Sequence, residues 1–194
     1  MTKGDTPFPY AIIDTAMMGS LLAEVDQQWP APEWPGWVGY DPTIEKKKAS
    51  DLATPIPRSV SLALALMARL QPGKLVYLYD TLPDLALCGA GMHEIPPGGH
   101  LGCHLDASHH PRLGLERAWS AVLYVHREWE PGWGGELVLH DKDRDPVGRI
   151  EPRPGRLVVF ATGARSWHSV APVTGPQPRR SLALFGYRLA TAPG

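Results

Sequence analysis

The chain has 194 residues, a length that one hydrophobic core can serve, so we expect a single domain spanning residues 1–194. Its formal net charge of −1 comes from 19 basic and 20 acidic residues that are scattered along the chain. The composition therefore argues against a partner such as nucleic acid or an anionic membrane surface, and it leaves the oligomeric state open.

Residues 1–14 lack the basic flank and the continuous apolar run of a secretory signal. No later stretch is long and apolar enough to span a bilayer. Only Cys88 and Cys103 are present, and two thiols without a secretory context are expected to be reduced. These features together predict a soluble, cytoplasmic protein.

Two helices are predicted in the N-terminal part of the chain. The first covers residues 14–29, where Asp14 can cap a run of apolar residues at helical spacing. The second covers residues 58–70 and ends before Pro72. Between them, residues 30–57 are rich in Trp and Pro, and the repeated prolines predict a long loop.

The periodicity shifts toward two from about residue 87, where short β-branched and aromatic runs alternate with Gly/Pro turns. We therefore expect a mainly β protein with N-terminal helices and a jelly-roll, or double-stranded β-helix, core. Residues 1–86 would be a helical support with a substrate loop, and residues 87–190 the catalytic core. The predicted strands lie in ALCGAGMHEI, GCHLDA, AWSAVLYVHRE, GGELVLHD, VGRIEPRPG, RLVVFATG, SWHSVAPV and RRSLALFGYRL.

The sequence GGHLGCHLD places His104 and Asp106 two residues apart in a predicted strand, so both side chains should project from one face. His168 follows 168 − 104 = 64 residues later, and a closed sheet can bring it beside the pair. Two imidazoles and one carboxylate leave coordination positions open, which suits non-haem Fe(II). Alone, the H-x-D pattern is weak, because a strand histidine is more often structural.

A candidate anion anchor follows His168. Arg179 and Ser181 in RRSLALFGY share a strand face, and an arginine fork can grip a carboxylate while the serine hydroxyl adds a further hydrogen bond. Such an anchor suits a dicarboxylate cosubstrate. Arg180 is the alternative, but the R-x-S register favours Arg179.

From Glu94 to Tyr187 the chain resembles the 2-oxoglutarate/Fe(II) dioxygenase superfamily in its prolyl 4-hydroxylase-like branch. The order and spacing of the matching pieces carry the resemblance, since any one of them could be accidental. They are PPGGHLGCHLD, AVLYV, WGGELVL, PRPGRLVVF, SWHSVAPV and the R-x-S of RRSLALFGY.

The resemblance implies Fe(II), 2-oxoglutarate and O2 as the reacting partners, with ascorbate as an optional supporting reductant. It implies a metal site at His104, Asp106 and His168, a salt bridge from Arg179 to 2-oxoglutarate, and a hydrogen bond to the same carboxylate from Tyr124 in AVLYV. Many members of the branch carry a tyrosine just before the Pro-Gly-Gly turn, whereas residues 95–97 here read Ile-Pro-Pro. The cosubstrate pocket is therefore expected to have a different shape.

Asp106 also bears on the reaction, because related halogenases have a small residue at this place. By resemblance, hydroxylation or desaturation with release of succinate is expected. The WGGELVL element, seen in ribosomal-protein prolyl hydroxylases, makes a prolyl residue of a peptide or protein the first substrate class. A free amino acid or natural-product intermediate is the second.

Two other classes of protein could use the same ligands. A cupin-like sensor would keep the metal and bind ligands without turnover. A zinc hydrolase would activate water at the metal, but it gives no reason for Arg179 and Ser181.

The loop aromatics and the remaining histidines carry weaker predictions. A mobile lid over a substrate could be formed by the loop residues Trp29, Trp34, Trp37 and Tyr40 with Lys46–Lys48 after them. Alternatively, the tryptophans could pack on the sheet while the lysines are solvated. His109, His110 and Arg112 fit ordinary surface polarity better than substrate contacts. The residues read as structural or exposed are His93, His100, His126 and His140.

Overall fold

A computed structural model describes residues 1–15, 19–39, 45–51 and 53–190. The helices are α1 (Gly19–Gln27), α2 (Arg58–Arg69) and α3 (Pro72–Leu75). The N-terminal strands are β1 (Thr2–Gly4), β2 (Tyr10–Asp14), β3 (Trp37–Gly39), β4 (Lys48–Ser50) and β5 (Leu82–Pro83). The later strands are β6 (Gly91–Ile95), β7 (Leu101–His104), β8 (Glu116–Tyr124), β9 (Leu137–His140), β10 (Pro146–Ile150), β11 (Arg156–Ala161), β12 (His168–Val170) and β13 (Arg179–Arg188).

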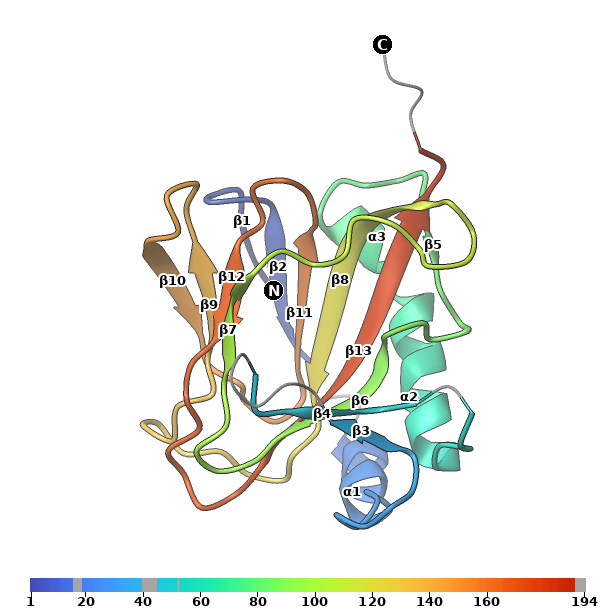
Figure 1. The fold of residues 1–194 in the computed structure, drawn as a ribbon, viewed down its shortest axis with the longest axis vertical. Coiled ribbons are helices and arrows are strands. Elements are labelled where there is room, and N and C mark those ends of the chain that lie inside the picture. Colours follow the sequence, from blue (N-terminus) through green and yellow to red (C-terminus); the bar gives the residue numbers. More distant parts are fainter. Residues whose placement is uncertain (16–18, 40–44, 52, 191–194) are drawn as a thin grey trace.

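Two antiparallel sheets face each other in the described part of the chain (Figure 1). The larger sheet has the order β1-β2-β11-β8-β13-β6-β4-β3, with β5 paired to β13, and the smaller has the order β10-β9-β12-β7. This arrangement is the expected jelly roll with helices packed outside it, so the predicted fold class is confirmed. Each of the eight predicted β runs overlaps one of the strands β6–β13.

The N-terminal part differs from the prediction because it also contains strands. Asp14 ends β2 rather than capping a helix, α1 covers Gly19–Gln27 of the predicted helix, and residues 16–18 lie outside the described residues. The expected loop at residues 30–57 contains β3 and β4, which extend the large sheet beyond β6. These strands are three residues long and exist through pairing with distant partners, which a local sequence pattern does not specify.

Strict alternation on the central strands divides the interior into two cores. On β8, Trp119, Ala121 and Leu123 face the helices, whereas Tyr124 faces the space between the sheets. On the helix side, α2 buries apolar residues at positions i, i+3, i+4 and i+7, each contributing about 1.5–3 kcal/mol when it is large and fully buried. These residues are Val60, Ala63, Leu64 and Met67.

The space between the sheets is only partly filled. Leu137, Leu139, Val158 and Phe160 pack at one side of it, and a cavity of about 490 Å³ occupies the rest. The inner faces of β6, β8 and β13 and the ends of β7 and β12 line this cavity. No helix in the described residues is long and apolar enough to cross a membrane.

Candidate active site

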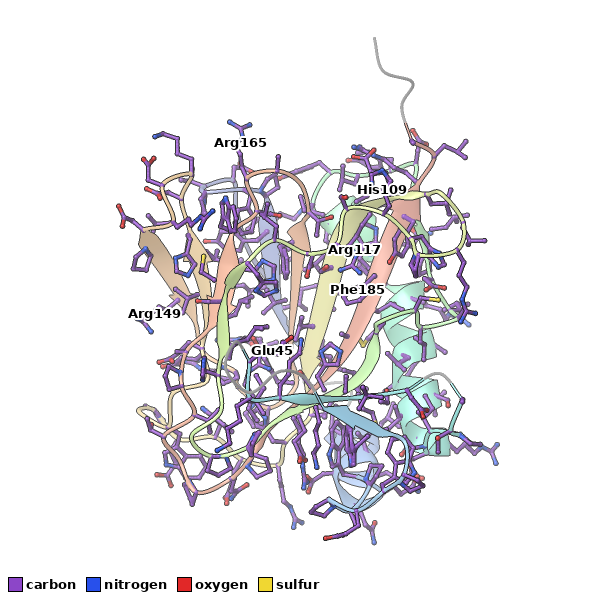
Figure 2. The ribbon with its side chains drawn as sticks, in the orientation of Figure 1. Glu45, His109, Arg117, Arg149, Arg165 and Phe185 are labelled. Carbon is purple, nitrogen blue, oxygen red and sulfur yellow. The ribbon has the colours of Figure 1, made fainter. Side chains whose placement is uncertain are left out.

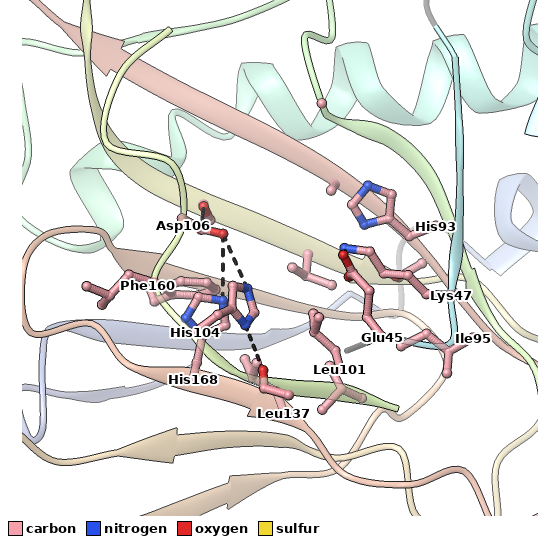
Figure 3. Close-up of a pocket in the computed structure, with 18 of the residues that line it drawn as sticks. Glu45, Lys47, His93, Ile95, Leu101, His104, Asp106, Leu137, Phe160 and His168 are labelled. Carbon is pink, nitrogen blue, oxygen red and sulfur yellow. Dashed lines mark hydrogen bonds and ion pairs between the residues drawn. The ribbon is translucent and has the colours of Figure 1, made fainter. Parts of the chain in front are cut away.

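The three predicted metal ligands converge at the cavity wall (Figure 3). His104 ends β7 and His168 begins β12, and the two residues are direct partners in the antiparallel pair. The sequence pattern predicted Asp106 within the same strand as His104. In the structure it lies just beyond the end of β7. Its Oδ1 is 3.8 Å from Nε2 of His104 and 3.7 Å from Nε2 of His168.

Backbone carbonyls set the tautomer of both histidines. Nδ1 of His104 lies 2.9 Å from the carbonyl oxygen of Gly102, and Nδ1 of His168 lies 2.8 Å from that of Ser166. A carbonyl oxygen only accepts hydrogen bonds, so each Nδ1 carries the proton and donates it. Each Nε2 therefore points its lone pair at the Asp106 carboxylate, an arrangement of three electron-pair donors that a divalent cation fits.

Electrostatics favour ionised Asp106 and neutral His168. Burial alone would raise the pKa of Asp106, but His168, the Arg117 guanidinium and the Ser120 hydroxyl together hold it below its ordinary value. The Ser120 hydroxyl donates a 2.6 Å hydrogen bond to Asp106 Oδ2, and Nη1 of Arg117 lies 3.5 Å from the same oxygen. Burial lowers the pKa of His168, against the opposing effect of Asp106.

A second cluster in the described residues, formed by Asp84, Cys88 and His110, fits a metal poorly. Here Nδ1 of His110 accepts hydrogen bonds from the backbone amides of Arg112 and Leu113. The proton therefore sits on Nε2, which faces Asp84 Oδ2 at 3.3 Å. Burial raises the pKa of the Cys88 thiol, which keeps it neutral. This cluster ties the Asp84 loop to the loop before β8.

The predicted cosubstrate residues gather deeper in the same region. Arg179 and Ser181 line the cavity, and Tyr124 is the direct cross-strand partner of Ser181. The Arg179 guanidinium donates to the carbonyl of Gly135 at 2.8 Å and to Ser181 Oγ at 3.3 Å, and it lies 4.7 Å from the centre of the Tyr124 ring. The Tyr124 hydroxyl is buried without a hydrogen-bond partner, so it has a donor available for a bound acceptor.

Arg180 points to the opposite face of β13. Its guanidinium binds Glu94 Oε2 at 3.0 Å and Asp26 Oδ1 at 3.1 Å. Arg179 therefore lines the cavity, whereas Arg180 forms ion pairs outside it. A dicarboxylate suits the Arg179, Ser181 and Tyr124 group, because all three offer donors.

Other polar residues lining the cavity were not singled out from the sequence. His93 on β6, which we expected to be structural or exposed, lines the cavity and is the cross-strand partner of Ser181. Glu45 and Lys47 also line the cavity and form a 3.0 Å ion pair there (Figure 3). None of these residues belongs to a local motif, so only the strand register brings them to the site.

Arg117 on β8 lines the cavity close to the metal ligands. Its guanidinium lies 3.8 Å from the centre of the Phe185 ring, and Nη2 donates to the Tyr187 hydroxyl at 3.4 Å (Figure 2). Together with its contact to Asp106, this stacking fixes the guanidinium plane at the wall. His109 lies in the loop before β8 and is exposed, as expected.

Residues 45–50, called the strap here, form part of the cavity wall. Lys48 turns outward to Glu94, at 2.8 Å, and lies over Trp37, whereas Lys47 turns into the cavity. Trp29 is buried and donates to Glu94 at 2.8 Å. In the described residues the tryptophans therefore pack on the sheet, while Tyr40, also assigned to the predicted lid, lies outside the described residues.

Comparison with known proteins adds independent information. A sequence model of the family described as the 2OG-Fe(II) oxygenase superfamily matches residues 90–187, half of the chain. Prolyl 3-hydroxylase 2 of Gallus gallus is 37% identical over 70 residues, which cover 36% of this chain. The match covers 10% of that relative and 9% of its Rattus norvegicus counterpart, so the chain corresponds to a small part of these proteins.

Solved structures match nearly the whole chain. A prolyl-4-hydroxylase from Pseudomonas putida aligns with a TM-score of 0.61 and 25% identity, covering 93% of this chain and 92% of that one. A prolyl hydroxylase from Trichoplax adhaerens, solved with a hypoxia-inducible-factor peptide fragment, aligns with a TM-score of 0.67 and 19% identity over 92% of this chain and 83% of that one. The second likeness, at 19% identity, concerns the fold.

Proposed function

The chain belongs to the 2OG-Fe(II) oxygenase superfamily, and from this premise we propose that it hydroxylates prolyl residues of a peptide or protein. Fe(II), 2-oxoglutarate and O2 are the cofactor and cosubstrates of this family. The proposed products are the hydroxylated residue, succinate and CO2, so that one oxygen atom of O2 enters the substrate and the other enters succinate.

One observation carries the proposal. A single cavity contains both a cluster of lone pairs suited to a divalent cation and a buried group of donors suited to a dicarboxylate. A zinc hydrolase would need only the first of these features, and the Arg179 donors with the unpartnered Tyr124 hydroxyl would have no purpose in it. The joint presence of both features favours an oxygenase that uses a dicarboxylate cosubstrate.

Each residue has a role in this proposal. Iron would be held by His104, Asp106 and His168, where it supplies dioxygen activation coupled to oxidative decarboxylation of 2-oxoglutarate. Arg179 and Ser181 would bind the distal carboxylate of the cosubstrate, with the Tyr124 hydroxyl as a third donor. Ser120 and Arg117 hold the Asp106 carboxylate in place and ionised.

The relatives support a prolyl substrate in a peptide. The curated relatives are named prolyl 3-hydroxylases, and one structural neighbour was solved with a peptide fragment bound. The strap leaves the cavity accessible to a chain segment, since His104 retains a side-chain exposure of 32%. A peptide could therefore present one residue to the metal site.

The test is a turnover assay under air with purified protein, Fe(II), 2-oxoglutarate and a library of capped proline-containing peptides. We expect succinate formation to depend on peptide and a mass gain of 16 Da on proline in the product. Asp106→Ala should abolish both, and the exposed-residue variant His109→Leu should retain both.

Other outcomes would redirect the assignment. A +16 Da product on free amino acids alone would replace the peptide substrate with a small molecule. If 2-oxoglutarate binds at the metal-loaded site but no substrate ever yields succinate, the protein is a ligand-binding sensor and the hydroxylase proposal fails.

A further inference from the structure

Unsatisfied polar atoms gather around the cavity. Four buried side-chain polar atoms among the described residues have neither a hydrogen-bond partner nor an ion-pair partner. Two of them, His93 Nε2 and Arg117 Nε, belong to residues that line the cavity. A third is the hydroxyl of Tyr124, whose ring lies beside the Arg179 guanidinium. Because burying a polar atom without a partner is costly, this concentration indicates ligand groups that complete the bonds.

These three atoms do not all suit the same ligand. Arg117 Nε and the Tyr124 hydroxyl are donors, whereas Nε2 of a neutral histidine can accept. The proposed cosubstrate is a dianion with carboxylate and keto oxygens, so it offers only acceptors. It can satisfy the donors, but it cannot satisfy an acceptor. Any acceptor directed into the cavity must therefore serve another molecule.

His93 offers such an acceptor. Its Nε2 is buried without a hydrogen-bond partner, and the residue lines the cavity. A neutral imidazole carries one proton, and with that proton on Nδ1 the Nε2 atom has a free lone pair. Burial, reinforced by Lys47, lowers the pKa of His93 to about 3, so the ring is neutral at physiological pH.

The placement of His93 suits contact with a substrate. His93 lies on β6 between two neighbouring strands. Its cross-strand partners are Ser181 on β13 and Ala49 on β4, which belongs to the strap. Its ring points into the cavity beside the Glu45–Lys47 ion pair, which the strap carries over the same space (Figure 3). The wall opposite the metal ligands thus presents His93 Nε2 without a partner, beside a Glu45 carboxylate that is paired with Lys47.

We propose that His93 is a specificity-determining residue whose Nε2 accepts a hydrogen bond from the substrate. This inference rests on the proposed function and deepens it. A prolyl residue within a peptide has no N–H of its own, so the matching donor is the backbone N–H of an adjacent residue. The site would then prefer a proline followed by an ordinary amide over one followed by a group without N–H.

The test combines protein variants with matched peptides. The peptide is the library member that gives the most succinate, and its partner replaces the amide after proline with an ester, which removes only the N–H. Wild type is compared with His93→Leu, which removes the acceptor, and His93→Gln, whose amide oxygen restores one. His109→Leu makes the same substitution at an exposed histidine and serves as the control. Turnover gives KM, and calorimetry on Zn(II)-loaded protein with 2-oxoglutarate gives peptide affinity.

We expect the ester to weaken peptide binding to wild type about tenfold, the size of one hydrogen bond. His93→Leu should weaken the amide peptide by a similar factor and should no longer distinguish amide from ester. His93→Gln should recover part of the difference, and the affinity for 2-oxoglutarate should stay within about twofold. Equal discrimination by wild type and His93→Leu would overturn the proposal. A loss of 2-oxoglutarate affinity as large as that in Tyr124→Phe would also overturn it, because His93 would then belong to the cosubstrate pocket.

A separate measurement distinguishes failure of this inference from failure of the prolyl assignment. If no peptide binds or yields succinate, the prolyl assignment fails. The ¹⁵N spectrum of the imidazoles still reports the state of His93 without any substrate. An unprotonated Nε2 that is insensitive to 2-oxoglutarate supports an acceptor reserved for another molecule. A protonated Nε2, or one that shifts with 2-oxoglutarate, contradicts it.

Discussion

Individual hydrogen bonds from neighbouring groups set the tautomer of each histidine and the orientation of the carboxylate at the metal site. Carbonyls of Gly102 and Ser166 fix the histidine tautomers, and the Ser120 hydroxyl fixes the carboxylate. In the Asp84–Cys88–His110 cluster, two backbone amides impose the opposite histidine tautomer. Ligand residue types alone therefore do not define a metal site, because the partners of Nδ1 decide whether Nε2 can bind a cation.

Removing the Ser120 hydroxyl should weaken the metal site. Ser120→Ala leaves Asp106 Oδ2 without its 2.6 Å donor, so the carboxylate is less well oriented and its pKa rises. We expect the dissociation constant for Fe(II), or for Zn(II) as a redox-inactive probe, to increase about tenfold. Anaerobic titration calorimetry measures this change. The control is Ser108→Ala at an exposed serine, and equal affinity for both variants would show that Ser120 does not orient the ligand.

Arg179 and Arg180 provide a matched pair of neighbouring cations on opposite faces of one strand. Arg179→Gln removes the charged donor in the cavity and should raise the dissociation constant of 2-oxoglutarate by about one to two orders of magnitude. Arg180→Gln should leave that constant within about twofold and instead lower stability, because Arg180 binds Glu94 and Asp26. Calorimetry on Zn(II)-loaded protein measures the 2-oxoglutarate dissociation constant of each variant. A larger increase in Arg180→Gln than in Arg179→Gln would identify Arg180 as the anchor.

At the scale of elements, Glu94 connects four segments that are distant in sequence. Its buried carboxylate accepts from Trp29 after α1, pairs with Lys48 of the strap and with Arg180 of β13, and is itself on β6. Because these bonds hold the strap against the sheet, they also fix the position of Glu45 and Lys47 at the cavity. The strap is therefore a wall of the site, and the contacts of Glu94 on the side away from the cavity hold it in place.

Loss of this carboxylate should release the strap. Glu94→Ala leaves Lys48 and Arg180 without their shared partner, and since both cations are partly solvated we expect a loss of about 2 kcal/mol in the free energy of unfolding. Urea titration measures it. Trypsin should cut after Lys46–Lys48 faster than in wild type. Glu24→Ala, at an exposed glutamate of α1, should change neither, and an unchanged cleavage rate in Glu94→Ala would show that other contacts hold the strap.

The elements differ in how far the sequence specifies them. Strands β6–β13 were predictable because each carries its own apolar alternation between Gly/Pro turns. Strands β3 and β4 were not, because three residues in a proline-rich stretch become strands only when β6 offers them an edge. The same limit applies to the site. His104, Asp106 and Arg179 lie in spaced motifs, whereas His93, Glu45 and Arg117 reach the cavity through long-range register.

At the scale of the whole molecule, the two faces of the large sheet differ in what they carry. Its outer face packs against α1 and α2 with apolar side chains, and its inner face carries the cavity with ionisable groups. Two histidines of this cavity, and His126 outside it, are buried in the neutral form. Burial is the largest effect that lowers the pKa of His93 to about 3, that of His126 to about 4, and that of His168 below its ordinary value.

Buried neutral histidines make stability depend on pH in a definite direction. In the unfolded chain each histidine binds a proton near pH 6.5, but in the folded protein these residues do so only at lower pH. Below pH 6.5 the unfolded state therefore binds more protons, and the free energy of unfolding falls as the pH falls. Each such histidine contributes up to about 1.4 kcal/mol per pH unit, and the contribution of His126 ends near pH 4.

The window between pH 6.5 and 5 isolates this effect, because the carboxyl groups whose pKa is lowered titrate at more acidic pH. These groups are Asp14, Asp106 and Glu116. Urea unfolding of the metal-free protein should show stability that is flat above pH 7 and declines steeply through this window. His126→Leu should reduce the slope by up to about 1.4 kcal/mol per pH unit, whatever its effect on stability at pH 7.5. His109→Leu, at an exposed position, should leave the slope unchanged. Identical slopes in all three proteins would mean that His126 takes up its proton as readily in the folded chain as in the unfolded one.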